Sequence, residues 1–199
     1  LASELTADGA GAAYLETVNT YRLRDEATGR DADPASLTAR VFPQLERTER
    51  RFHEGAKDPV KTTHVTYAYD AWGNVSGYFD AGEPDDSRDD VYATITYTGT
   101  DPGHAACVVH HLVGLPVAIT VRPAKDSGPV LRERRGRYSC TTGALKRLRR
   151  RADSAWAESD FGYDRYGNLK QLTGPVDANG QRHVLVFGYD AAEIGRAHV

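Results

Sequence analysis

Residues 67–75 read Tyr-Ala-Tyr-Asp-Ala-Trp-Gly-Asn-Val, and residues 161–169 read Phe-Gly-Tyr-Asp-Arg-Tyr-Gly-Asn-Leu. Both follow the frame aromatic-x-Tyr-Asp-x-x-Gly-Asn-aliphatic, and a third copy begins with Phe-Gly-Tyr-Asp at residues 187–190. The residues before each Tyr-Asp pair are β-formers, and Gly-Asn tolerates the positive φ of a tight turn. Each copy therefore predicts a strand, a turn and a second strand.

The copies recur at an irregular spacing. Gly143 lies 24 residues before Gly167, within Cys-Thr-Thr-Gly-Ala-Leu at residues 140–145. This degenerate copy keeps the Gly and the aliphatic residue of the frame and has Cys where the other copies have Asp. Tyr163 and Tyr189 are 26 residues apart. Recurrence of such a unit predicts a repeat array, because one unit cannot bury its own apolar face.

The Tyr-Asp frame resembles the YD repeats of bacterial Rhs proteins. The run from Asn-Thr-Tyr-Arg-Leu at residues 19–23 through Val-Phe-Pro-Gln-Leu at residues 41–45 is similar to the middle region of related proteins. Those relatives are the B components of insecticidal toxin complexes and plasmid virulence proteins. The resemblance covers residues 14–192. It implies an all-β fold of antiparallel β-hairpin repeats that form part of a large spiral β-sheet shell around a C-terminal toxin domain.

The sequence predicts three parts. Residues 1–13 are small and polar and predict a disordered or cut end. Residues 14–192 are the repeat region, and residues 193–199 have the character of a non-native tail, since the frame requires Gly at position 193. Because the sequence has no Met and starts at Leu1, we expect a fragment of a longer protein. We expect such a fragment to aggregate when expressed alone, since its missing neighbours would leave apolar faces uncovered.

The composition is consistent with a β-sheet protein and argues against some classes of partner. Apolar residues make up 40% and charged residues 27% of the 199, which suits strands buried on one face only. The net charge of −3 gives no overall attraction to nucleic acid or to an anionic membrane. No apolar run approaches the ~20 residues that a membrane helix needs. We therefore expect no nucleic-acid partner and no membrane span.

Two segments are ambiguous between helix and strand. Residues 107–121 are the most apolar stretch and divide at Gly114 and Pro116, which predicts two short strands. Apolar residues in the segment 145–155 recur at helical spacing. The degenerate repeat copy that leads into this second segment favours a strand there as well.

An acidic loop at residues 80–90 carries six carboxylates. These oxygens could bind calcium, but the loop lacks the spacing of an EF-hand and has Pro84 at its middle. A solvated hairpin loop whose charges prevent edge pairing is the preferred interpretation.

Histidine and cysteine residues cluster near the apolar stretch. His110 and His111 could bind a metal with His104 or Cys107. Adjacent residues of a strand face opposite sides, however, so the pair is poorly placed to share one ion. Cys107 and Cys140 could form a disulfide, but without C-x-x-C spacing two reduced thiols are the expectation, and the redox compartment stays open.

A basic island occupies residues 122–151, with nine Arg and two Lys against Asp126 and Glu133. It could contact nucleic-acid phosphates, an acidic cargo or an acidic partner. It could also be the solvated side of two strands. The second interpretation is preferred, since the whole chain is acidic and no stacking aromatic residue interleaves the basic cluster at residues 146–151.

The sequence carries no motif for catalysis. It has no G-x-S-x-G elbow, no H-E-x-x-H and no phosphate-binding glycine loop. We therefore predict no enzyme activity, no catalytic, metal or cofactor-binding residue and no cofactor. The Asp of each copy (70, 164 and 190) is expected to accept backbone N–H groups across its turn. The Tyr before it (69, 163 and 189) is expected to pack on its counterpart in the next copy.

These patterns and the resemblance together predict a structural segment of the β-shell of a large secreted bacterial toxin. Its partners would be the rest of its own chain and an enclosed toxin domain, with other toxin-complex subunits as further candidates. The alternative is an extracellular adhesion or carbohydrate-binding module, which Trp72, Tyr78 and Trp156 on one outer surface would favour. A hydrolase would require a concave site with converging His and carboxylate groups.

Overall fold

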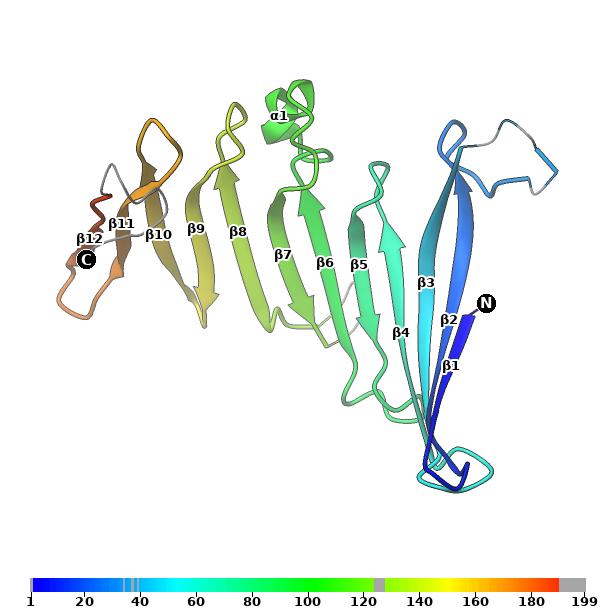
Figure 1. Cartoon of the computed structure of the whole chain (residues 1–199). Coiled ribbons are helices and arrows are strands. Elements are labelled where there is room, and N and C mark those ends of the chain that lie inside the picture. The colour runs from blue at the N-terminus through cyan, green and yellow to red at the C-terminus, as the bar shows by residue number, and fades with distance from the viewer. Residues whose placement is uncertain (1, 34, 37, 39, 124–127, 190–199) are drawn as a thin grey trace. The chain divides into compact units, whose positions relative to one another are not determined.

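The computed structural model describes residues 2–33, 35–36, 38, 40–123 and 128–189, and it is an all-β fold (Figure 1). Twelve antiparallel strands follow one another in the sheet in the order of the sequence. The predicted all-β, antiparallel fold class is confirmed. The strands are β1 Ala2–Ala7, β2 Ala13–Asp25, β3 Val41–Phe52, β4 Lys61–Tyr69, β5 Val75–Asp80, β6 Val91–Tyr97, β7 Pro116–Arg122, β8 Arg132–Tyr138, β9 Leu145–Ala152, β10 Ala155–Tyr163, β11 Leu169–Val176 and β12 Arg182–Val186.

The chain divides into two compact units. Unit 1 comprises Leu1–Thr94 and Val121–Leu131, and unit 2 comprises Ile95–Thr120 and Arg132–Val199. Each unit contains hairpins in which a strand pairs with the strand that follows it in the sequence, as in β2–β3 and β10–β11. Among the described residues, no helix is long and apolar enough to cross a membrane.

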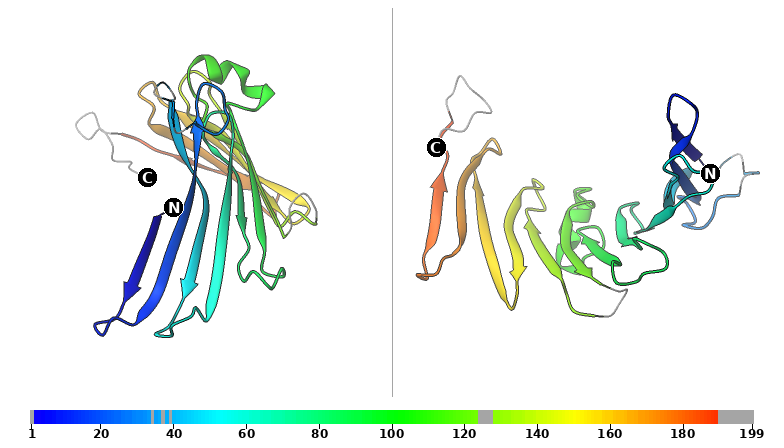
Figure 2. Two further views of the ribbon diagram at one scale, coloured as in Figure 1. Left: turned by 90° about the vertical axis from the view of Figure 1, so that its right-hand side faces the viewer. Right: turned by 90° about the horizontal axis from the view of Figure 1, so that it is seen from below.

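In unit 1, β1 is an ordered strand that lies along β2 (Figure 2, left). The expectation of a disordered end over residues 1–13 is wrong for Ala2–Ala7, because a tight turn closes this hairpin. The Asp8 carboxylate accepts the backbone N–H groups of Ala10 at 2.9 Å and Ala12 at 2.8 Å. Gly11 then takes a φ of 85°, which favours glycine. The Asp-x-x-Gly spacing at residues 8–11 could have indicated this turn, because the Tyr-Asp copies have the same spacing.

In unit 2, β9 confirms the strand that was preferred over a helix for residues 145–152. The expectation for residues 107–121 is half correct. Its second part is β7, but its first part begins in the short helix α1, Ala105–Val109, which follows the 3-10 helix η1, Pro102–His104. Periodicity cannot separate a short buried helix from a short buried strand.

A disulfide between Cys107 and Cys140 joins α1 to the turn between β8 and β9, with the two Cα atoms 4.3 Å apart. The expectation of two reduced thiols is therefore wrong. The two residues are 33 positions apart, so the sequence rule based on close cysteine spacing could not detect them. Cys107 is fully buried, which makes this bridge part of the small core of unit 2.

The buried core is thin in both units. Among the described residues, the buried apolar side chains are Ala81 and Cys107, and most strand residues are half-buried. Large apolar side chains remain exposed on β12, where Val184, Leu185 and Val186 are 51%, 46% and 61% exposed. A single layer of strands leaves such side chains for further chain to cover.

We expect the Cys140→Ser variant to lose about 3–4 kcal/mol of unfolding free energy, because the disulfide restricts a loop of 33 residues in the unfolded chain. Urea denaturation of the variant and of the oxidised protein measures this loss. Reductant should destabilise the wild-type protein by the same amount and leave the variant unchanged. Equal urea midpoints for all three samples would show that the bridge does not stabilise the fold.

Candidate functional site

The repeated Asp organises its turn identically in both complete copies. Asp70 Oδ1 accepts the backbone N–H groups of Trp72 and Asn74, each at 2.9 Å, and Asp70 Oδ2 accepts Asn74 Nδ2 at 3.0 Å. Asp164 makes the corresponding bonds with Tyr166 at 2.8 Å and with Asn168 at 2.9 and 3.0 Å. The predicted role of the Asp is confirmed at these two positions. Asp190, the third predicted copy, and the tail at 193–199 lie outside the described residues.

The degenerate copy at Gly143 forms a related turn that is one residue longer. Ser139 donates its backbone N–H to Ala144 O at 2.9 Å, as Asp70 does to Asn74 O at 2.9 Å. Ser139, and not Cys140, therefore takes the place of the Asp, which corrects the sequence alignment of the copies. This shift leaves Cys140 available for the disulfide.

The repeated Tyr connects one copy to the strand before it. Tyr163 donates its hydroxyl to Leu145 O at 2.9 Å, and Tyr189 donates to Leu169 O at 2.8 Å. The same bond occurs in unit 1, where Tyr69 donates to a β3 carbonyl at 3.0 Å. We expected each Tyr to pack on the next repeat Tyr; the bond to the preceding strand was missed.

Each of these hydroxyl bonds begins where a strand ladder ends. The β9–β10 ladder ends at the pair Arg147–Asp160, and the hydroxyl bond forms three residues beyond Asp160 and two residues before Arg147. The ladders β3–β4 and β11–β12 end with the same offsets. Burial raises the pKa of the Tyr163 hydroxyl, which keeps it protonated and able to donate.

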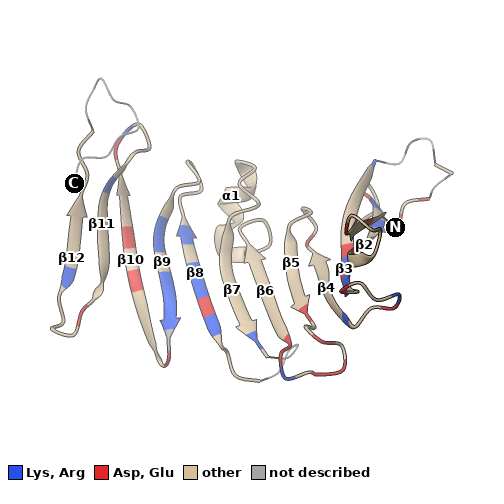
Figure 3. Cartoon of the chain, turned by 60° about the horizontal axis from the view of Figure 1, so that its bottom comes forward, with Lys and Arg blue, Asp and Glu red and all other residues tan. Residues whose placement is uncertain are grey.

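The basic island forms rows of arginine across unit 2, next to carboxylates on β10 (Figure 3). Strand register places Arg135 opposite Arg149, and Arg149 opposite Glu158. The next row on this face runs from Arg137 through Arg147 to Asp160. The predicted solvated strand face is thus a network of ion pairs. Lys125 and Asp126 of the island lie outside the described residues.

The carboxylates of this face differ in how closely they are bound. Asp160 lies 2.6 Å from Arg147 and 2.8 Å from Arg182. Burial opposes ionisation of Asp160, but the hydrogen bonds from these two arginines outweigh it and lower the pKa of this carboxyl. Glu158 is held more loosely, at 3.4 Å from Arg147 and 3.5 Å from Arg149. Close charge-assisted hydrogen bonds are about 2.7–2.9 Å long, so the Glu158 contacts are long ones.

An aromatic ring lies among these arginines. The guanidinium of Arg149 is 4.8 Å from the centroid of the Trp156 ring, and that of Arg135 is 5.4 Å from it. No sequence pattern indicates this contact, because Trp156 follows the island and only strand pairing brings it opposite Arg151. The expectation that no aromatic residue accompanies the island is therefore wrong in space. Cation–π contacts of this kind hold guanidinium groups in place.

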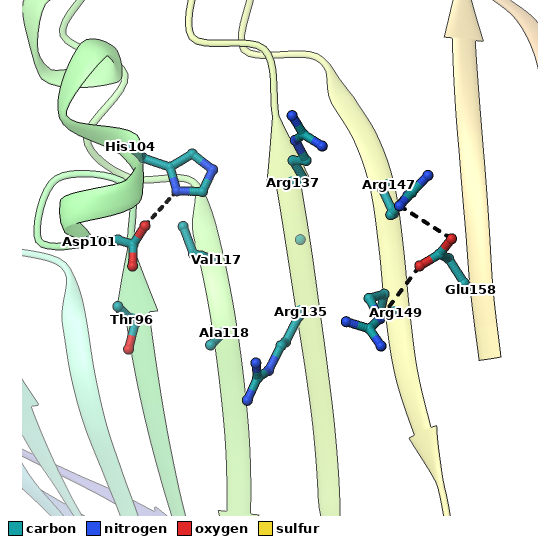
Figure 4. A pocket seen from close by; sticks show the side chains of 11 residues that line it. Thr96, Asp101, His104, Val117, Ala118, Arg135, Arg137, Arg147, Arg149 and Glu158 are labelled. Carbon is teal, nitrogen blue, oxygen red and sulfur yellow. Dashed lines mark hydrogen bonds and ion pairs between the residues drawn. The ribbon is translucent and has the colours of Figure 1, made fainter. Parts of the chain in front are cut away.

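A pocket of about 430 Å³ opens on this face of unit 2 (Figure 4). His104 and Asp101 lie on one side, with His104 Nδ1 2.6 Å from Asp101 Oδ2. Glu158 lies on the other side, beyond Arg149. His104 and Glu158 thus lie on opposite sides of the pocket, and Asp101 is the carboxylate that His104 contacts. The residues that line the pocket are Thr96, Asp101, His104, Val117, Ala118, Arg135, Gly136, Arg137, Arg147, Arg149 and Glu158.

The residues considered for metal binding have other partners or are dispersed. Cys107 is bonded to Cys140, and His104 is bonded to Asp101. His110 and His111 are exposed at the end of α1. Within the part of the chain that the structure describes, no group of three His, Cys, Asp or Glu side chains could hold a metal ion.

In the acidic loop, several carboxylates form ion pairs or hydrogen bonds with nearby side chains and backbone groups. Asp86 pairs with Arg88 at 2.6 Å, and Glu83 pairs with Lys61 of β4 at 2.6 Å. The Asp89 carboxylate accepts the backbone N–H of Glu83 at 3.2 Å. These contacts order a hairpin loop and match the preferred interpretation of residues 80–90.

The aromatic residues of the adhesion alternative have different surroundings. Trp72 is 48% exposed at its turn, and Tyr78 forms an edge contact with Tyr67 at 5.7 Å between ring centroids. Trp156 is in contact with two guanidinium groups. The Trp156 ring therefore faces guanidinium groups, which differs from the flat, open aromatic surface on which a sugar ring would stack.

Comparison with known proteins gives structural similarities at low identity. No family model and no curated protein matches the chain. The chain is similar to the solved TcdB2-TccC3-Cdc42 structure, with 13% identity and a TM-score of 0.45 over 94% of this chain and 11% of that one. The TcdB2-TccC3-TEV structure has 14% identity and a TM-score of 0.44 over 94% of this chain and 11% of that one. The Photorhabdus luminescens Tc holotoxin pore has 13% identity and a TM-score of 0.44 over 94% of this chain and 10% of that one. The chain thus spans about a tenth of the length of these structures.

We expect Tyr163→Phe to cost about 1 kcal/mol of unfolding free energy, because Leu145 O loses its hydroxyl donor in a half-buried place. Urea denaturation measures the change. Tyr166→Phe is the matched control, since Tyr166 is 72% exposed, and it should change stability by less than about 0.5 kcal/mol. Equal effects of the two variants would mean that the hydroxyl bond between strands is unimportant.

The turn at Asp164 should give a pH-dependent stability difference between the wild-type protein and Asp164→Ala. Burial opposes ionisation of Asp164, but hydrogen bonds from Asn168, Tyr166 and Gly167 outweigh it and lower the pKa of the carboxyl. A carboxyl with a lowered folded-state pKa stabilises the protein above its unfolded pKa, about 4, and this is lost as the pH falls through the folded pKa.

Urea midpoints at neutral pH and at about pH 3 test this pH dependence. The difference between the wild-type protein and Asp164→Ala should shrink at the acidic pH. Asp85→Ala, at an exposed position of the acidic loop, is the control and should show little difference at either pH. A difference between the wild-type protein and Asp164→Ala that stays constant with pH would contradict the role of the ionised carboxylate.

Proposed function

We infer that the chain is a non-enzymatic segment of the β-sheet wall of a large toxin of the Rhs and toxin-complex type, and that the wall encloses a C-terminal effector domain. The observation that carries this inference is the use of the repeated residues. The hydroxyls of Tyr163 and Tyr189 each donate to a carbonyl of the preceding strand, and the Asp164 carboxylate organises the turn that follows Tyr163. A residue that recurs in the copies of the frame and bonds each copy to the strand before it serves a structural scaffold.

The sheet supports growth by addition of strands. In the described part of the chain, β1 pairs with β2 and β12 pairs with β11, so each has one strand neighbour. The exposed Val184, Leu185 and Val186 lie on β12. An edge strand with apolar side chains readily pairs with another strand, and the rest of the protein's own chain is the partner that the repeat resemblance implies.

The disulfide supports a secreted location. Bonds such as Cys107–Cys140 form and persist in oxidising surroundings and are uncommon in the cytosol. A secreted bacterial toxin, with other toxin-complex subunits as further partners, fits both this bond and the resemblance of the Tyr-Asp frame.

The complete coding sequence and its protein test this proposal. We expect further copies of the Tyr-Asp frame, followed by an unrelated terminal domain. In limited proteolysis of the complete protein, that domain should survive until denaturant opens the wall, whereas the same domain expressed alone should be cleaved quickly. Equal cleavage rates would contradict enclosure. A short gene whose product binds defined glycans on an array would favour the adhesion module instead.

A further inference from the structure

The arginine face of unit 2 has more cationic than anionic groups. Five guanidinium groups share three carboxylates, those of Glu133, Glu158 and Asp160, and a sixth guanidinium group, that of Arg137, lines the pocket without an ion pair among the described residues. The six belong to Arg135, Arg137, Arg147, Arg149, Arg151 and Arg182. A face built only to balance its own charges would not need this excess.

Unit 1 shows what a balanced version of the same strand is like. Arg47 and Arg147 are equivalent, because each ends the ladder with the following strand. Two residues further on, β3 has Glu49, which pairs with Arg47 at 2.6 Å and with Arg51 at 2.7 Å. At that position β9 has Arg149. Arg47, Glu49 and Arg51 carry a net charge of +1, whereas Arg147, Arg149 and Arg151 carry +3, so the charge reversal at this one position makes the face of β9 more cationic.

Two arginines of the pocket retain unused hydrogen-bonding capacity. Arg149 Nε is buried and makes no hydrogen bond among the described residues, and it faces the Glu158 carboxylate in an ion pair of 3.5 Å. Arg137 is exposed at the pocket, and the described residues provide no hydrogen-bond or ion-pair partner for its guanidinium. The Arg137 guanidinium therefore has N–H groups that can form charge-assisted hydrogen bonds to the oxygens of a ligand in the pocket.

The guanidinium groups are also held in position before any ligand arrives. Arg135 is bound by the carboxylate of Glu133 at 2.8 Å, and that carboxylate side chain is 10% exposed. Both Arg135 and Arg149 contact the Trp156 ring. Groups that are already ordered lose less conformational freedom when a ligand binds, which favours binding.

We propose that this pocket, lined by Arg135, Arg137, Arg147 and Arg149, binds carboxylate side chains of an acidic polypeptide segment. Guanidinium groups bind carboxylates through paired N–H···O bonds, and the Glu158 carboxylate lies near two guanidinium groups of this face in ion pairs of 3.4 and 3.5 Å. That the segment belongs to the enclosed effector rests on the proposed function. The binding of acidic polypeptide by the pocket does not.

The surroundings favour a polypeptide over a nucleic acid. Trp156 is engaged by two guanidinium groups, so its ring is a poor platform for stacking a base. Glu158 and Asp160 interrupt the arginine rows and would repel a continuous phosphate backbone. Separate carboxylates on flexible side chains can avoid these two groups.

Fluorescence anisotropy with a labelled oligo-glutamate peptide tests the proposal on the whole chain. The chain is fused to a soluble carrier protein so that it stays in solution, and the carrier alone is the blank. Arg137→Gln should weaken binding about fivefold, and this variant breaks no ion pair among the described residues. Arg134→Gln is the matched control, since residue 134 lies on the opposite face of the same strand and should leave the affinity unchanged.

A change of opposite sign completes the test. Glu158→Gln should tighten oligo-glutamate binding at least about twofold, because it frees Arg147 and Arg149 from an internal carboxylate. A merely destabilised protein would not bind more tightly. The proposal is overturned if oligo-glutamate does not bind, if Arg134→Gln weakens binding as much as Arg137→Gln, or if a single-stranded oligonucleotide binds more tightly. These outcomes leave the protease-protection result for the wall unaffected, so the two proposals fail separately.

Discussion

The hydrogen bond from a tyrosine hydroxyl to the carbonyl of the preceding strand is the constraint on which the sheet depends. At the ends of the ladders β9–β10 and β11–β12, backbone pairing stops and a half-buried carbonyl needs a donor. Tyr163 and Tyr189 supply that donor. A backbone carbonyl without a partner is costly, which explains why the same aromatic residue recurs at these ladder ends and at that of β3–β4.

The turn that follows each tyrosine depends on a second local interaction. An Asp carboxylate gathers two backbone N–H groups, and the Gly three residues later takes the positive φ. The turn at Ser139 is one residue longer, and the Ser139 hydroxyl accepts one backbone N–H group, that of Thr142, at 3.4 Å. There the disulfide from Cys140 adds a covalent link to α1.

Charge is arranged on top of this scaffold and differs between its parts. The strand β3 alternates Arg47, Glu49 and Arg51 and satisfies itself with Glu16 of β2. The equivalent strand β9 replaces the central carboxylate with Arg149 and gathers cations around a pocket. Since these side chains are half-exposed, the fold tolerates either arrangement, and the surface is available for a specific function.

The sequence alone determined the antiparallel hairpins and the turns at Asp70 and Asp164, because both follow from contacts within about ten residues along the chain. Tertiary structure decided the Cys107–Cys140 bridge, the acceptors of the tyrosine hydroxyls and the position of Trp156 among arginines. These depend on strand register, which aligns residues far apart in the chain. Within one hairpin the turn sets the register, but which residues meet across successive hairpins depends on every turn and pairing between them, so no single stretch of sequence shows these contacts.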